Sequence, residues 1–99
     1  MITQVRVVSI APGKLSPIMS WGKEVCEYCK SRAGIEVKMG LPIGGNPNRL
    51  FFISQYESLA SLEKLWGKLL SDPQYLALLG RAAEYVIAGS VHDEIVQSL

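Results

Sequence analysis

The chain has 99 residues, of which 48% are hydrophobic and 19% charged, with a formal net charge of +1. This length is typical of one domain, so we expect a single domain over residues 1–99. The hydrophobic fraction excludes a disordered chain, and the mixing of acids with bases argues against a nucleic-acid partner or an anionic membrane surface. No apolar run approaches the roughly 20 residues that span a bilayer. With no secretory signal and no useful disulfide visible, we expect a cytoplasmic protein.

The first half of the chain shows a strand and then a helix. Residues 2–11 are rich in β-branched side chains and end at Pro12, which predicts a strand. Residues 14–32 follow a helical period, with Ser16 expected as the N-cap and Gly34 as the stop. The buried stripe of this helix should consist of Ile18, Gly22, Val25 and Cys29, flanked by Leu15 and Trp21.

The second half predicts two strands, a broken helix and a last strand. Residues 35–41 and 49–56 flank the turn at 44–48, which favours an antiparallel hairpin. Ser58 should cap a helix that is broken and restarted at residues 71–73. The helical stripes should bury Leu59, Leu62, Trp66 and Leu69 before the break, and Leu76, Leu79 and Ala83 after it. A strand over 86–96 should close the order, with Ile87, Val91 and Ile95 evenly spaced along it.

The order β-α-β-β-α(α)-β predicts an α+β protein of the ferredoxin-like type, a four-stranded antiparallel sheet with its helices on one face. The other face is expected to mix apolar with polar side chains: Val8, Ile10, Phe52 and Tyr56 beside Arg6, Ser54, Ser90 and His92. Such a face is too apolar to be left in water. We therefore expect a homodimer in which two sheets pair into an α+β barrel.

This order and several motifs make the chain resemble the dimeric α+β barrel superfamily, including its antibiotic-biosynthesis monooxygenase-like and NIPSNAP-like domains. The resemblance covers essentially the whole chain. It rests on residues 56–63, Leu65-Trp66, the break at 71–73 and the closing residues 89–91. It implies the fold but no single activity, since the superfamily includes oxygenases, isomerases, haem-degrading enzymes and proteins without an assigned activity.

The resemblance also allows the haem-degrading reading to be tested. Those members use an Asn on the first strand, a Trp on the second helix and a His about ten residues later. Trp66 could supply the second element, but Leu76 occupies the position of the His and the first strand has no Asn. The sequence therefore does not support haem degradation.

Two further motifs carry little chemistry. Cys26 and Cys29 form a CxxC inside a predicted helix, where neither a redox motif nor a metal carrier places it, and a zinc site needs about four ligands. We expect packing thiols, no metal and no cofactor. The strand at 49–56 resembles an RNA-stacking strand but lacks its small residues and a basic surround.

The candidate site residues are few. His92, the only histidine, is a candidate catalytic base on the expected dimer face, or else an interface histidine. Trp66, Tyr75 and Arg81 are candidate ligand-binding residues, because related oxygenases hold aromatic substrates there. The alternative is that Trp66 packs in the core and Arg81 lies in solvent.

Three functions remain open from sequence. The favoured hypothesis is a dimeric domain that binds a small apolar or aromatic ligand between helices and sheet. The second is a cofactor-independent monooxygenase-like or isomerase-like enzyme, in which His92 moves a proton if the fold brings it close. The third is a purely structural dimerisation module, for which a tightly packed interior is the expected signature. Whether the chain is an enzyme is left open.

Overall fold

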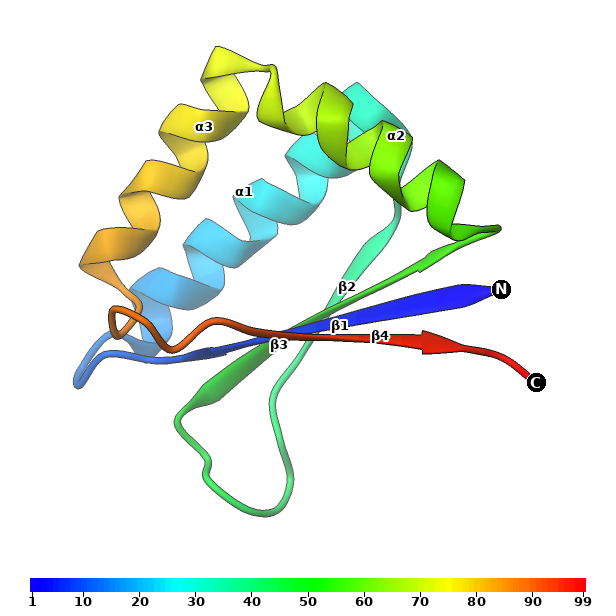
Figure 1. Ribbon diagram of the computed structural model, residues 1–99. Coiled ribbons are helices and arrows are strands. Elements are labelled where there is room, and N and C mark those ends of the chain that lie inside the picture. The colour runs from blue at the N-terminus through cyan, green and yellow to red at the C-terminus, as the bar shows by residue number, and fades with distance from the viewer.

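The protein, described over residues 1–99 by a computed structural model, consists of two layers: a four-stranded sheet and helices that all cover one of its faces (Figure 1). In chain order the elements are β1 (Ile2–Ser9), α1 (Leu15–Ala33), β2 (Val37–Gly40), β3 (Arg49–Tyr56), α2 (Leu59–Leu70), α3 (Pro73–Gly80), a short 3₁₀ helix η1 (Arg81–Glu84) and β4 (His92–Gln97). The strands lie in the order β2-β3-β1-β4 and neighbouring strands are antiparallel. The predicted ferredoxin-like fold is confirmed. No helix combines the length and apolar character that a membrane span requires.

The helix boundaries follow from local chemistry. The side chain of Ser58 accepts a hydrogen bond from the backbone N–H three residues later, as expected of an N-cap. Asp72 caps α3 in the same manner, and Pro73 occupies the first position of that helix, where no N–H is needed. Gly34 ends α1 with φ of 68°, a conformation that glycine adopts without steric cost. Only the predicted cap at Ser16 is wrong, because α1 already begins at Leu15.

The two faces of the sheet are the reverse of what we expected. The side chains assigned to the dimer face in β1 and β3 lie under the helices instead, and Val8, Phe52 and Tyr56 are only 4, 8 and 6% exposed. The full set that faces the helices from these two strands comprises Ile2, Gln4, Arg6, Val8, Leu50, Phe52, Ser54 and Tyr56. The physical reason is that both sides of β1 mix apolar with polar side chains, so that alternation alone does not decide which side packs.

The open face carries the other half of each strand. In β1 and β3 its apolar side chains are Val5, Val7, Phe51 and Ile53, all partly exposed. His92 pairs with Val7 in the β1–β4 register and therefore lies on this open face, as expected. Ser90 does not belong to a strand; its hydroxyl accepts a hydrogen bond from the backbone of Ser9.

The segment before β4 departs most from the prediction. The strand expected over 86–96 is interrupted: Val86 makes a single bridge to Ile10, and β4 begins only at His92. Gly89 takes φ of 77° between them, in a turn that an extended strand cannot contain. The evenly spaced side chains expected along this strand are all about half exposed: Ile87, Val91 and Ile95.

The helix expected to reach residue 84 also differs. It ends at Gly80 and continues as η1. Tyr75 is its buried side chain, whereas Leu76 and Ala83 are exposed. Leu79 faces the interior as predicted, whereas Tyr75 and Ala82 take the inward positions expected for Leu76 and Ala83, so that an aromatic hydroxyl enters the interior in place of a leucine.

Candidate ligand-binding site

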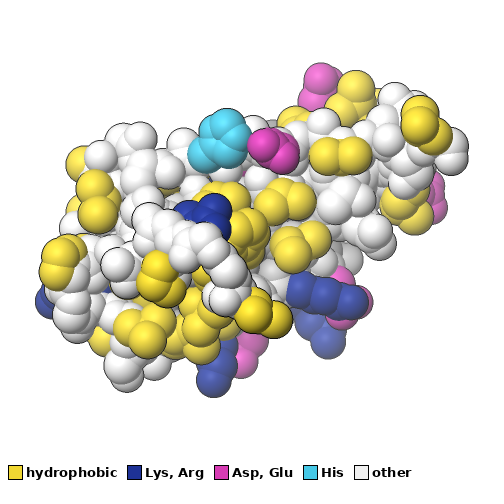
Figure 2. All heavy atoms as spheres, turned by 90° about the horizontal axis from the view of Figure 1, so that it is seen from below, with side chains coloured by type: hydrophobic (Ala, Val, Ile, Leu, Met, Phe, Trp, Pro, Cys, Tyr) yellow, Lys and Arg dark blue, Asp and Glu magenta, His cyan; other side chains and the backbone are white.

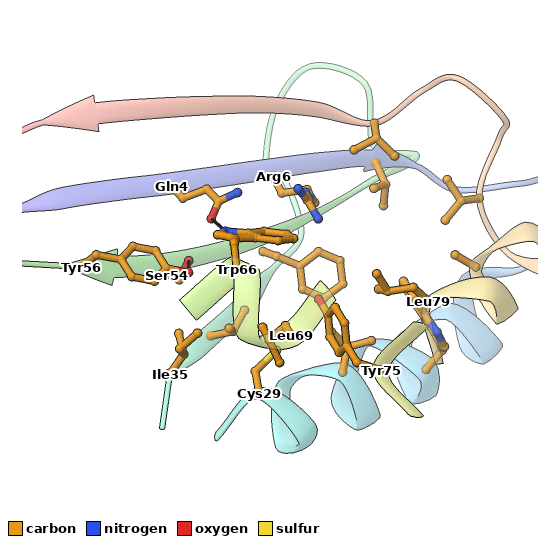
Figure 3. Close-up of a pocket in the computed structure, with 18 residues that line it drawn as sticks. Gln4, Arg6, Cys29, Ile35, Ser54, Tyr56, Trp66, Leu69, Tyr75 and Leu79 are labelled. Atoms are coloured by element: carbon orange, nitrogen blue, oxygen red, sulfur yellow. Dashed lines mark hydrogen bonds between the residues drawn. The ribbon is translucent and has the colours of Figure 1, made fainter. Parts of the chain in front are cut away.

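A cavity of about 240 Å³ lies between the helix layer and the sheet (Figure 3). Its lining is mostly apolar and comes from β1, β2, β3, all three α-helices and the segments on either side of Ser90. Val91 belongs to the lining and is 55% exposed, so the cavity opens to solvent beside the start of β4.

The helices approach the sheet unequally, which leaves room for this cavity. On α1, Gly22 lies so close to the sheet that an added Cβ would collide with the side chain of Met39. The second helical segment is instead broken into α2 and α3 at Asp72. Tyr75 and Leu69, one from each side of this break, point into the cavity (Figure 3).

One end of the cavity carries a closed network of four polar side chains. The guanidinium of Arg6 donates to both carboxylate oxygens of Asp93, each at 2.7 Å. It also lies over the indole of Trp66, with Cζ 4.5 Å from the ring centroid. Gln4 completes the network: its Oε1 accepts from the indole N–H at 3.1 Å and its Nε2 donates to Asp93 at 3.4 Å. The plane of Trp66 is therefore held from two directions.

The ion pair sets the charge at this end. The hydrogen bonds from Arg6 hold the pKa of Asp93 below its ordinary value of 3.8, and the same bonds raise the pKa of Arg6. Both groups are charged at neutral pH. Their side chains are 27% and 33% exposed, so the pair stands between the cavity and solvent.

The remaining polar groups of the lining are hydroxyls and a thiol. Ser54 donates a hydrogen bond of 3.1 Å to the hydroxyl of Tyr56. Burial raises the pKa of Tyr56 and that of Tyr75. Burial also raises the pKa of the Cys29 thiol, and a hydrogen bond with Tyr75 acts in the opposite direction. These groups remain neutral at pH 7 and can donate or accept hydrogen bonds.

The structure brings together only part of the residue set predicted from sequence. Trp66 and Tyr75 both line the cavity. Arg81 lies outside it and forms a surface ion pair of 2.6 Å with Glu24. His92 is on the other face of the sheet, with its side chain 67% exposed (the cyan side chain in Figure 2).

Of the two cysteines, Cys29 lines the cavity and Cys26 packs beside the core, where burial raises its pKa to about 11. Both are free thiols. Nowhere do three potential metal ligands lie together.

Sequence reasoning missed three of the four residues in the network, namely Gln4, Arg6 and Asp93. A signal was present: Gln4 and Arg6 are two residues apart in β1, so both face the same side as Ile2 and Val8. Polar side chains on a buried face need partners. That pattern indicates a polar site on this side of β1, and the structure shows that this side lies under the helices.

Known proteins support the fold. No protein-family model matches the chain. No curated protein matches it either. Among solved structures, an uncharacterised NIPSNAP domain protein from Burkholderia xenovorans has a TM-score of 0.86 at 16% identity, over 100% of this chain and 95% of that one. A NIPSNAP family protein from Agrobacterium tumefaciens has a TM-score of 0.84 at 19% identity, over 99% and 92% of the two chains. A putative antibiotic biosynthesis monooxygenase from Nitrosomonas europaea has a TM-score of 0.74 at 15% identity, over 100% and 99%.

The predicted resemblance to NIPSNAP-like and monooxygenase-like domains is therefore confirmed at the level of the fold. At identities below 20% this likeness says nothing about which side chains act. The function must be argued from the cavity itself.

Proposed function

We propose that this protein is a small-molecule-binding domain that holds an apolar or aromatic ligand between its helices and its sheet and works as a homodimer. The observation that carries the proposal is the cavity of about 240 Å³, mostly apolar, with one polar network at its end. A concave apolar site with a few convergent polar groups is the usual form of a small-molecule site.

The size of the cavity bounds the ligand. An engineered apolar cavity of about 150 Å³ in another protein holds benzene. The 240 Å³ available here suits a compound with one ring or two fused rings and a single polar substituent. The indole of Trp66 and the ring of Tyr75 offer aromatic surface to such a ligand.

The two alternatives have less support. In the enzyme hypothesis His92 moves a proton only if the fold brings it close to Trp66 and Tyr75, and His92 lies on the other face of the sheet. The structural-module hypothesis expected a tightly packed interior, and the interior contains a cavity. Ligand binding is the function that needs neither feature.

Two adjacent alanines allow a matched test of binding in the cavity. Ala82 lines it, whereas Ala83 is exposed. We expect Ala82→Phe to fill the space and abolish binding of a naphthalene-sized probe such as 2-naphthamide, measured by calorimetry. Ala83→Phe should bind the probe like the wild type. Equal binding by both variants, with melting temperatures close to that of the wild type, would disprove the cavity as the site.

The proposed dimer uses the open face of the sheet. One row of directly paired residues crosses all four strands of this face. It is apolar in the middle and oppositely charged at its ends, and consists of Lys38, Ile53, Val5 and Glu94. If two subunits pack sheet to sheet about a two-fold axis parallel to the strands, the row of one subunit faces the same row of its partner in the opposite direction. Each Lys38 then meets the partner's Glu94. Figure 2, which views this face, shows apolar side chains gathered over its centre.

A charge exchange tests this arrangement. Lys38 and Glu94 lie on opposite edge strands, so they are too far apart to pair within one subunit. Glu94→Lys alone and Lys38→Glu alone should each weaken the dimer, and the double variant should restore it, as measured by sedimentation equilibrium. A wild-type monomer at micromolar concentration would disprove the dimer and leave the cavity proposal intact.

A further inference from the structure

The lining of the cavity carries one formal charge, the guanidinium of Arg6, and the carboxylate of a residue outside the lining neutralises it. Arg6 is the only charged side chain among the residues that line the cavity. Both carboxylate oxygens of Asp93, which is not part of the lining, accept hydrogen bonds from it at 2.7 Å. The titratable groups Cys29, Tyr56 and Tyr75 line the cavity as neutral groups, since burial raises each pKa. The site as a whole is electrically neutral.

The position of Asp93 builds this cancellation into the folded chain at neutral pH. Asp93 is the direct register partner of Arg6 across β1 and β4, so strand pairing presents its carboxylate to the guanidinium. Gln4 donates a third hydrogen bond to the same carboxylate at 3.4 Å. An anionic ligand would have to compete with this bidentate pair, which is already formed without any loss of translational freedom. A cationic ligand would meet the positive guanidinium from inside the cavity.

We propose that Asp93 is a specificity-determining residue that makes the cavity select uncharged ligands over anionic ones of the same shape. The inference rests on the proposed function, since it concerns the ligand of the same cavity. The ligand class is thereby narrowed to neutral compounds of one or two rings, whose polar substituent hydrogen-bonds to the hydroxyls or to the network. If Asp93 lost its charge, Arg6 would become a free cation at the end of an apolar cavity and would attract carboxylates.

The test uses two ligands that differ in charge but not in shape, 2-naphthamide and 2-naphthoate. Calorimetry on the wild-type protein at pH 7 should show the amide binding about tenfold more tightly. This is the factor expected when a ligand carboxylate must compete with Asp93 for one charged hydrogen bond from Arg6. Asp93→Asn should raise the affinity for naphthoate by about tenfold and change that for the amide by less than about twofold.

Two further variants separate this effect from its alternatives. Glu63→Gln removes the same charge from an exposed position on α2 and should leave the ratio of the two affinities unchanged. The double variant Arg6→Met with Asp93→Asn should lose the gain in naphthoate binding, because that gain acts through Arg6.

Equal affinities in the wild type would overturn the inference about charge and keep the binding proposal. So would a gain in naphthoate binding of the same size in Glu63→Gln. Absence of binding by both compounds would instead contradict the proposed function, and this inference with it. If Asp93→Asn does not fold, the wild-type comparison still tests the inference, because equal affinities for the two compounds overturn it.

Discussion

The two faces of the sheet differ in which kinds of side chain they bury and which they leave exposed. Under the helices, Arg6, Gln4 and Ser54 are covered, and each is hydrogen-bonded to a side chain from the same face or from α2. On the open face, apolar side chains such as Val5 and Ile53 remain partly exposed, and the charged side chains lie on the edge strands or, in the case of Arg49, at the end of an inner strand. Polar groups can thus be interior when they are paired, and the exposed apolar groups are the ones that the proposed dimer would cover.

The strongest test of this difference between the two faces is to truncate two adjacent phenylalanines that lie on opposite faces. Phe52→Ala, in the covered face, should lower the free energy of unfolding by about 3–5 kcal/mol, because it removes a ring from the core. Phe51→Ala, on the open face, should lower it by less than about 1 kcal/mol in the monomer and act mainly on dimerisation. Urea denaturation at low protein concentration measures both. Similar losses for the two variants would show that the faces are energetically alike.

A smaller effect concerns the polar network of the covered face. Trp66→Phe removes the indole N–H that donates to Gln4 and should cost about 1 kcal/mol of stability, the usual net value of one hydrogen bond. Because Gln4 is free to reorient, we expect the loss of ligand affinity to exceed the loss of stability. Thermal melts paired with calorimetric titration separate the two. A variant that melts far below the wild type and binds normally would make Trp66 a core residue only.

The ion pair at the cavity mouth predicts a pH dependence. The pKa of Asp93 in the folded protein lies below 3.8, so its pairing stabilises the fold above that value. This contribution is lost as the pH falls through the lowered pKa. Wild type should therefore exceed Asp93→Asn in stability by no more than about 1 kcal/mol at pH 7, since the pair is partly exposed. Urea unfolding at descending pH should show the difference shrinking below pH 3.8 and not above it.

The smallest effect is expected at Arg81, which makes an ion pair of the same short length but on the surface. Its side chain and that of Glu24 are 46% and 49% exposed, and solvent screens such pairs. Arg81→Ala should change stability by less than about 0.5 kcal/mol and leave ligand affinity unaltered. Reduced binding of 2-naphthamide by this variant would bring Arg81 back as a ligand-binding residue.

Local features of the chain were sufficient to predict most of the fold. Ser58, Asp72 and Gly34 act on backbone groups within a few residues, and such caps can be recognised without knowing the tertiary structure. The stripe of α1 was equally readable, because Ile18, Cys29 and their neighbours repeat at the helical period. The turn at Gly89 was not, and the last strand was predicted too long as a result.

The candidate site shows the limit of such reasoning. Trp66 and Tyr75 could be singled out by type, as large aromatic residues on a helix near the sheet. Arg81 was chosen as the cation beside them and His92 as the only histidine, but the fold places them on an outer surface and on the opposite face. Residue type was enough to propose candidate site residues, but only the tertiary structure showed which of them lie in the cavity and which are exposed.

By itself, the sequence determined the order of the elements and, through that order, the ferredoxin-like topology. The tertiary structure decided which side of the sheet the helices cover, because both sides of β1 mix apolar with polar side chains and a one-residue change of phase reverses every side chain. It also decided that Arg6 meets Asp93 and that Trp66 meets Gln4, partners 87 and 62 positions apart. Contacts of such range depend on strand register and helix docking, and no local pattern of residues encodes either.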